Sequence, residues 1–106
     1  MLSCARVDIV TVGEAFEDLI FAGLPRLPRP GEEIRVPIFQ ATIGGGAAIS
    51  AIAAARLGLR VGVMTAIGAP GATTLRSERI SVINLRKAEE RTAVSVALST
   101  AHDRSV

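Results

Sequence analysis

Apolar residues along the chain gather into short continuous runs, which predict buried strands. The runs Val7–Gly13 and Arg60–Gly68 are rich in β-branched residues and do not alternate with polar ones. Such runs are typical of strands that are buried on both faces of a parallel sheet, so we place the second run at the centre of the sheet. Ile80–Leu85 predicts a further strand.

The clearest predicted helix, Ala47–Leu57, lies between the first two of these strands. It is apolar almost all the way round, with Ser50 as the only polar residue before Arg56. We therefore expect the helix to be covered on most sides. Gly58 follows directly, at the position where a left-handed backbone costs glycine nothing. Strand, helix and strand in one sheet join by a right-handed crossover, which predicts an α/β fold. Ala69–Arg79 predicts at most a short helix.

Two further strand segments are predicted in the first half of the chain. They are Asp18–Leu24 and Ile34–Ile43, and the second can supply one or two short strands. The proline-rich segment between them, Pro25–Glu33, is expected to be extended, because each proline fixes its own φ and restricts the residue before it. Pro37 keeps its strand at an edge or a bulge of the sheet.

The last predicted strand, Thr92–Thr100, alternates strictly between large and small residues. Val94, Val96 and Leu98 share one face with Thr92, so we expect this large-residue face to cover another element. The chain then turns, begins what resembles a returning strand, and stops. A hairpin cut in its second arm leaves an open edge, so the sequence is expected to be a fragment.

Composition narrows the class of protein. With 106 residues, the chain is at most one domain, and 49% hydrophobic residues argue against disorder. The 12 basic residues are scattered and lack interleaved aromatics, which argues against nucleic-acid binding. No segment predicts a membrane helix or a signal peptide. The single cysteine, Cys4, makes no intrachain disulfide, which suits a reducing cytoplasm.

Three glycines, Gly44–Gly46, directly precede the predicted helix. They do not form a Walker A loop, because the only lysine, Lys87, is far away. They do not form a dinucleotide fingerprint, because Ile49 stands where the third glycine or alanine belongs and no acidic residue follows at the right spacing. One His and one Cys make no metal site. Two interpretations remain: backbone amides at the helix start bind an oxygen-rich ligand, or the glycines only allow tight packing.

Four stretches, taken together, match a known family. VDIVTVGEAFEDLI, RLPRPGEEI and GGGAAISAIAAARLGLRVGVMTAIG, in that order, resemble the N-terminal part of PfkB-type carbohydrate kinases, the ribokinase family. RTAVSVALSTAHDRSV is similar to the family's later lid strands. The resemblance implies a ribokinase-like three-layer α/β fold with a small β-sheet lid, truncated to its N-terminal portion. Residues 1–106 would form a single partial domain, with lid strands at about 18–43 and 92–106.

The resemblance also implies a substrate site. An ATP-dependent kinase of this kind transfers the γ-phosphoryl group to a hydroxyl of a sugar or nucleoside. Asp18 matches the family's sugar-binding aspartate, and Gly44 and Gly45 match the diglycine that lies against the sugar, with Gly46 beside them. Two positions depart from the family pattern: Ile49 replaces the usual sugar-binding asparagine, and Phe16 replaces a small polar residue.

Other parts of the family's machinery have no counterpart here. The catalytic aspartate, the anion-hole glycines and the adenine site lie in a C-terminal region, so no catalytic residue is assigned. ATP and Mg²⁺ are implied by the family, with their binding residues absent from this chain. We therefore expect the isolated chain to be inactive. The acidic pair usual after the strand-ending Gly68 is also missing. The alternative is a degenerate, non-catalytic sugar-binding or assembly module, forming a homodimer through its lid strands.

Overall fold

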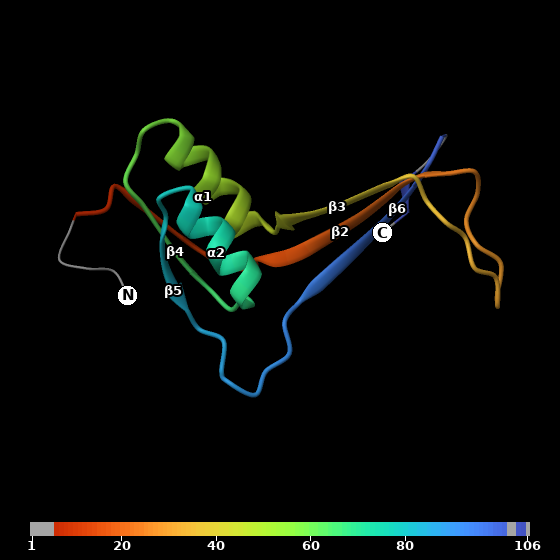
Figure 1. Cartoon of the computed structure of the whole chain (residues 1–106). Helices are drawn as coiled ribbons and strands as arrows, with labels where there is room; N and C mark the ends of the chain where they lie inside the picture. Colours follow the sequence, from red (N-terminus) through yellow and green to blue (C-terminus); the bar gives the residue numbers. More distant parts are fainter. Residues whose placement is uncertain (1–5, 102–103, 106) are drawn as a thin grey trace.

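The computed structural model describes residues 6–101 and 104–105 of the chain. Its strands and helices form two sheets and one helical layer (Figure 1). The elements, in chain order, are β1 (Ile9–Val12), β2 (Phe16–Leu24), β3 (Ile38–Gly44), α1 (Gly46–Arg56), β4 (Val61–Thr65), α2 (Ala69–Ser77), β5 (Ser81–Asn84), β6 (Val94–Thr100) and β7 (Arg104–Ser105).

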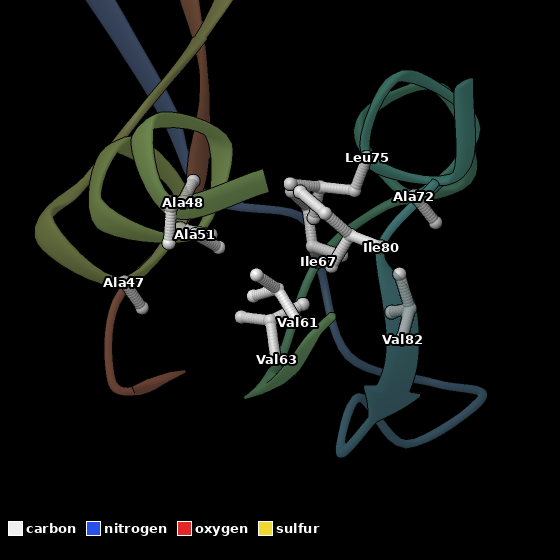
Figure 2. Close-up of a cluster of buried hydrophobic side chains, with 12 residues drawn as sticks. Ala47, Ala48, Ala51, Val61, Val63, Ile67, Ala72, Leu75, Ile80 and Val82 are labelled. Atoms are coloured by element: carbon white, nitrogen blue, oxygen red, sulfur yellow. The ribbon is translucent and has the colours of Figure 1, made fainter. Parts of the chain in front are cut away.

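The first sheet is parallel and has the order β1-β4-β5. The predicted central position of β4 is therefore confirmed. Val61 and Val63 of β4 and Val82 of β5 point toward the two helices, which cover the same face of this sheet (Figure 2). On α1, the side chains in this core cluster are small: Ala48 and Ala51 are fully buried. Alanines let the helix approach the sheet closely, and the resulting α/β part holds the main core.

The prediction that β1 is buried on both faces is wrong. Val10 is 37% exposed and Val12 is 68% exposed. The register pairs these two residues with Gly62 and Met64 of β4, on the face opposite the helices. No described element covers that face, and β1 also lies at an edge of its sheet. An apolar run indicates that a strand is suited to burial. Whether the strand is buried depends on whether other residues of the protein pack over it.

Helix α1 is covered on only one side, so the expectation of cover on most sides is also wrong. Ala47, Ala48, Ala51 and Ala54 are buried, whereas Ile49 is 59% exposed. The helix end follows the prediction. Gly58 has φ +90° and stands directly after the C-cap residue Leu57. The amide of Leu59 donates to Ala54 O and that of Gly58 to Ala55 O, which is a Schellman motif.

The second sheet has the order β3-β2-β6-β7 and extends away from the α/β part (Figure 1). We call it the projecting sheet. It makes the molecule long: the radius of gyration is 16.3 Å, against about 13 Å expected for a compact chain of this length. Its strands lie within or close to the two segments expected for a lid. Pro37 directly precedes β3, an edge strand, as predicted.

The prediction that the large-residue face of β6 covers another element holds only at one end. Val94 is 50% exposed and Val96 is 42% exposed, whereas Ala97 on the opposite face is fully buried. Leu98 is half-buried and, with Phe21, lines a cavity of about 210 Å³. The other walls are Leu24, Pro28, Ile34 and Val36. The proline-rich loop thus covers only the far end of this face. The returning strand is present as β7, while Val106 and Cys4 lie outside the described residues.

The proline-rich loop carries its own ion pair. Arg26 donates to both carboxylate oxygens of Glu32, and the amide of Arg29 donates to Glu32 Oε1 at 3.1 Å. These bonds lower the pKa of Glu32 from 4.5 to about 2. A carboxylate with a lowered pKa adds stability above pH 4.5, and this is lost as the pH falls toward 2. The pair is exposed, so solvent screening keeps its contribution small.

Candidate functional site

The candidate site lies at the carboxyl ends of β1 and β4, where parallel α/β sheets usually bind ligands. Gly13 directly follows β1 and begins the turn into β2. Its amide donates to Met64 O at 3.2 Å, and its carbonyl accepts a bond from Thr65 Oγ1 at 2.6 Å. Thr11 Oγ1 in turn donates to Ala47 O at 2.8 Å, in the first turn of α1. These bonds fix the turn, the sheet and the helix start relative to one another.

Two of the three predicted glycines are required by packing. A Cβ on Gly44 would lie 2.6 Å from Cε2 of the Phe16 ring. Gly45 has φ +97°, and a Cβ there would lie 2.8 Å from Ala15 Cα and still closer to Glu14 O. The chain entering α1 therefore lies directly on the turn between β1 and β2. At Gly44 and Gly45 the packing interpretation is supported, and contact with a sugar stays a prediction.

Gly46 differs from its two neighbours because it faces open space. A Cβ on Gly46 would meet no atom within 4 Å. In the first turn of α1, the amide of Ala47 donates to Glu14 O. The amides of Gly46 and Ala48 donate to no acceptor among the residues the structure describes. Ile49 stands beside them and is 59% exposed. The helix start thus offers two N–H donors next to an apolar side chain.

Asp18 lies on β2, on the same face as Phe16 because side chains alternate along a strand. The register places Thr42 of β3 opposite Asp18 on one side and Ser95 of β6 on the other. Opposite residues of neighbouring strands share a face. A polar row therefore crosses three strands of the projecting sheet, with the carboxylate in the middle. Asp18 is half-buried, and the ring of Phe16 connects this face to the glycine segment through Gly44.

Thr42 and Ser95 were missed by the sequence analysis. Ser95 belongs to the small-residue face of β6, whereas the sequence analysis made a prediction only for the large-residue face. Thr42 lies in a strand with no distinguishing motif. Only the pairing of the three strands brings them to Asp18, and the pairing of Asp18 with Ser95, 77 residues later in the chain, is not readable from one sequence.

Glu17 occupies the opposite face of β2 and was also missed. Its Oε1 atom is buried and has no hydrogen-bond partner within the described part of the chain. A Cβ on Gly68, the N-cap of α2, would lie 3.1 Å from that oxygen. The partial positive charge of the helix start favours a carboxylate there. We interpret Glu17 as a structural partner of α2, separate from the Asp18 row.

The carboxyl groups whose pKa values are lowered lie away from this site. A hydrogen bond from Arg60 lowers the pKa of Asp8, and one from Arg56 lowers the pKa of Glu78. Both pairs sit at the amino ends of the strands. Within the described residues there is no group of three or more Cys, His, Asp and Glu residues that could hold a metal ion. The row around Asp18 thus offers one carboxylate and two hydroxyls.

None of the described helices is both long and apolar enough to cross a bilayer.

Comparison with known proteins gives the family of this arrangement. Residues 6–106 match the family model described as pfkB family carbohydrate kinase. Ribokinase from Cryptococcus neoformans, solved in complex with ADP, is 31% identical with a TM-score of 0.72; the match covers 95% of this chain and 33% of that chain. No curated protein sequence matches the chain.

Two further solved structures share the fold. Ribokinase from Giardia lamblia is 19% identical with a TM-score of 0.80, covering 94% of this chain and 34% of that one. Ribokinase from Arabidopsis thaliana, complexed with ribose and ATP, is 23% identical with a TM-score of 0.71, covering 95% and 35%. The chain thus spans about one third of the length of these proteins. Of the three layers expected for this fold, the described residues form two: the parallel sheet, and the layer of helices α1 and α2 on one face of it.

Proposed function

The chain belongs to the pfkB family of carbohydrate kinases, and we propose that it forms the sugar-side part of an ATP-dependent kinase that phosphorylates a hydroxyl of a sugar or nucleoside. The observation that carries this proposal is the polar row Thr42–Asp18–Ser95, which lies on the face of β2 that Phe16 connects to the open start of α1. A carboxylate between two hydroxyls is suited to accept hydrogen bonds from a diol.

Each residue of the proposed site has a distinct task. Asp18 accepts hydrogen bonds from substrate hydroxyls and so fixes the orientation of the ring. The amides of Gly46 and Ala48 donate to a hydroxyl oxygen at the helix start, where the helix dipole favours oxygen atoms. Ile49 cannot form a hydrogen bond, so it packs against the C–H surface of the ring. Phosphoryl transfer depends mostly on positioning and charge stabilisation, and this chain supplies positioning.

ATP, the phosphoryl donor, and its Mg²⁺ ion need binding residues other than those of the proposed sugar site. The described residues offer no carboxylate cluster for the metal, so the groups that hold the nucleotide and its metal would come from outside this set. The chain by itself then binds a sugar without turning over ATP.

The test uses the 106-residue chain alone. We expect ribose, which the Arabidopsis ribokinase holds in its structure, or adenosine as a nucleoside probe, to shift the amide NMR signals of Asp18, Gly46, Ala48 and Ser95. We expect no ATP hydrolysis or sugar phosphate in the same samples. Shifts confined to residues outside this set would contradict the site, and ATP turnover lost on replacing Asp18 by Ala would contradict the division of tasks.

A second candidate function, a non-catalytic assembly module, is favoured by one observation. Phe39, Val94 and Val96 are exposed together on the face of the projecting sheet opposite Asp18. Exposed apolar patches of this kind often mark protein contacts. On this proposal, two copies pair through these faces.

Sedimentation velocity tests the assembly proposal. We expect a concentration-dependent dimer that Val96→Lys converts to a monomer, because the lysine places a charge in the contact. Gln40→Lys is the matched control, since Gln40 is exposed on the other face of the same sheet, and its variant should still dimerise. A native chain that stays monomeric at all concentrations rules this function out.

A further inference from the structure

A second cavity lies at the opposite end of the α/β part from the glycine segment. It has a volume of about 340 Å³ and opens where β4 and β5 begin and where both helices end. Its walls include Arg6, Gly58, Arg60, Arg79 and Ser81. Helix α1 has 11 residues, so its two ends are about 16 Å apart at the usual rise per residue. The cavity is therefore separate from the proposed sugar site.

The carboxylates around this cavity are already paired. Arg60 binds both oxygens of Asp8, with Nη2 to Oδ1 at 3.0 Å and Nε to Oδ2 at 3.3 Å. Arg56 binds Glu78 in the same two-pronged way, with Nη2 to Oε1 at 2.6 Å and Nε to Oε2 at 3.2 Å. These two arginines are thereby neutralised.

Two guanidinium groups in the cavity wall have no partner among the described residues. Arg6 and Arg79 make no ion pair and no side-chain hydrogen bond in the described part of the chain. Basic residues are common near helix C-termini because they offset the helix dipole. Here Arg56 and Arg76 already occupy the last turns of the two helices. Arg6 and Arg79 thus leave a surplus of two positive charges at the cavity.

Arg79 also has an unusual backbone. Its φ is +64°, the only positive φ of a non-glycine residue in the described chain. Ile80 N donates to Leu75 O and Arg79 N to Arg76 O, so Arg79 stands where Gly58 stands after α1. Glycine adopts this conformation without strain, whereas arginine does not. Strain of this kind often accompanies a functional side chain.

We propose that Arg6 and Arg79 bind a phosphate group in this cavity. The planar guanidinium fork matches phosphate oxygens in two-pronged hydrogen bonds, and two surplus positive charges match a dianion better than a monocarboxylate. The Ser81 hydroxyl can donate to a third oxygen. Val7, Leu59 and Val61 supply apolar walls, which suit the carbon part of a phosphate monoester. Free inorganic phosphate would make the same hydrogen bonds to the two guanidinium groups.

The test measures binding of inorganic phosphate and of glycerol 3-phosphate to the full 106-residue chain, by calorimetry and by NMR shifts of Leu59, Arg60 and Ser81. Sodium chloride and sodium acetate at equal ionic strength are the controls. We expect both phosphate probes to bind and the salts to leave these signals unshifted. Tighter binding of glycerol 3-phosphate supports a phosphorylated small molecule, and equal binding supports free phosphate.

The decisive variant is Arg79→Gly, because it separates the side chain from the fold. It removes the guanidinium while relieving the backbone, so we expect phosphate affinity to fall at least about tenfold with no loss of thermal stability. Arg6→Ala should weaken binding to a similar extent. Arg76→Ala is the matched control: it removes an equal charge from the last turn of α2, three residues from Arg79 and outside the cavity wall, and affinity should change less than about twofold. Native affinity in Arg79→Gly, or an equal loss in Arg76→Ala, overturns the proposal.

Discussion

Replacing Asp18 by Asn is expected to weaken ribose binding by about tenfold to a hundredfold while leaving the fold intact. The substitution keeps the shape of the side chain but removes the charge that strengthens its hydrogen bonds. A hydrogen bond to a charged group contributes about 1.5–3 kcal/mol, which corresponds to this range of affinity. The amide also places a donor where the substrate hydroxyls need an acceptor. NMR titration of the 106-residue chain with ribose measures the change.

The neighbouring carboxylate provides the control for this experiment. Glu17 adjoins Asp18 but faces the other side of β2, toward Gly68 and α2. Glu17→Gln should therefore leave ribose affinity within about twofold of the native value, a difference well below one hydrogen bond. If both variants weakened binding equally, the loss would reflect the negative charge of the strand rather than contact with Asp18. Native affinity in Asp18→Asn would remove this residue from the site.

Replacing Gly45 by Ala is expected to lower the free energy of unfolding by about 2–6 kcal/mol. The residue has φ +97° and ψ 144°, a backbone conformation close to one found essentially only in glycine, which costs another residue about 1–3 kcal/mol. Its Cβ would also overlap the backbone of Glu14 and Ala15, and overpacking typically costs a further 1–3 kcal/mol. Small domains have only about 5–15 kcal/mol of total stability, so this variant should be close to unfolding. Urea denaturation followed by circular dichroism measures it.

The adjacent glycine should respond in the opposite direction. Gly46→Ala places a Cβ in open space at the first position of α1. Alanine favours the helix by up to about 1 kcal/mol over glycine, so we expect this variant to be slightly more stable than the native chain. Equal destabilisation of the two variants would show that the whole glycine segment is constrained. No destabilisation of Gly45→Ala would mean that the turn between β1 and β2 can move away.

Features that depend on local sequence could be predicted well. The end of α1 at Gly58 needs only a glycine after an apolar helix, and the start of β3 after Pro37 needs only the missing amide of proline. The central position of β4 also followed from its continuous apolar run. The first two features are determined by residues close together in the chain, whereas the position of β4 also depends on its pairing with β1 and β5.

Burial could not be predicted in the same way. The runs that form β1 and α1 are as apolar as those of buried elements, yet Val12 and Ile49 are exposed. Whether an apolar surface is covered depends on residues elsewhere, and this chain spans about one third of its solved relatives. In β6, the bulky face of the strand was taken as the covered face, although Val94 and Val96 are exposed.

In the candidate site, too, local motifs identified some residues, whereas others depend on contacts between distant parts of the chain. The resemblance to the family singled out Asp18 and the glycine segment from motifs. A motif does not show why each glycine is present, whereas the contacts of Gly45 with Glu14 and of Gly44 with Phe16 do. The hydroxyls beside Asp18 required the register of three strands, which no local pattern contains.

The close contact between Gly45 and the Glu14–Ala15 backbone has a mechanical consequence. This contact lies where the projecting sheet meets the α/β part, so any rotation of the sheet would take place about it. A small rotation about a pivot displaces distant atoms most and nearby atoms least. The proline-rich loop at the far end would sweep through a wide arc, whereas Asp18, only two residues along β2 from Phe16, would hardly move. A rotation of the projecting sheet about this contact would therefore leave the Asp18 row nearly in place while displacing the outer end of the sheet.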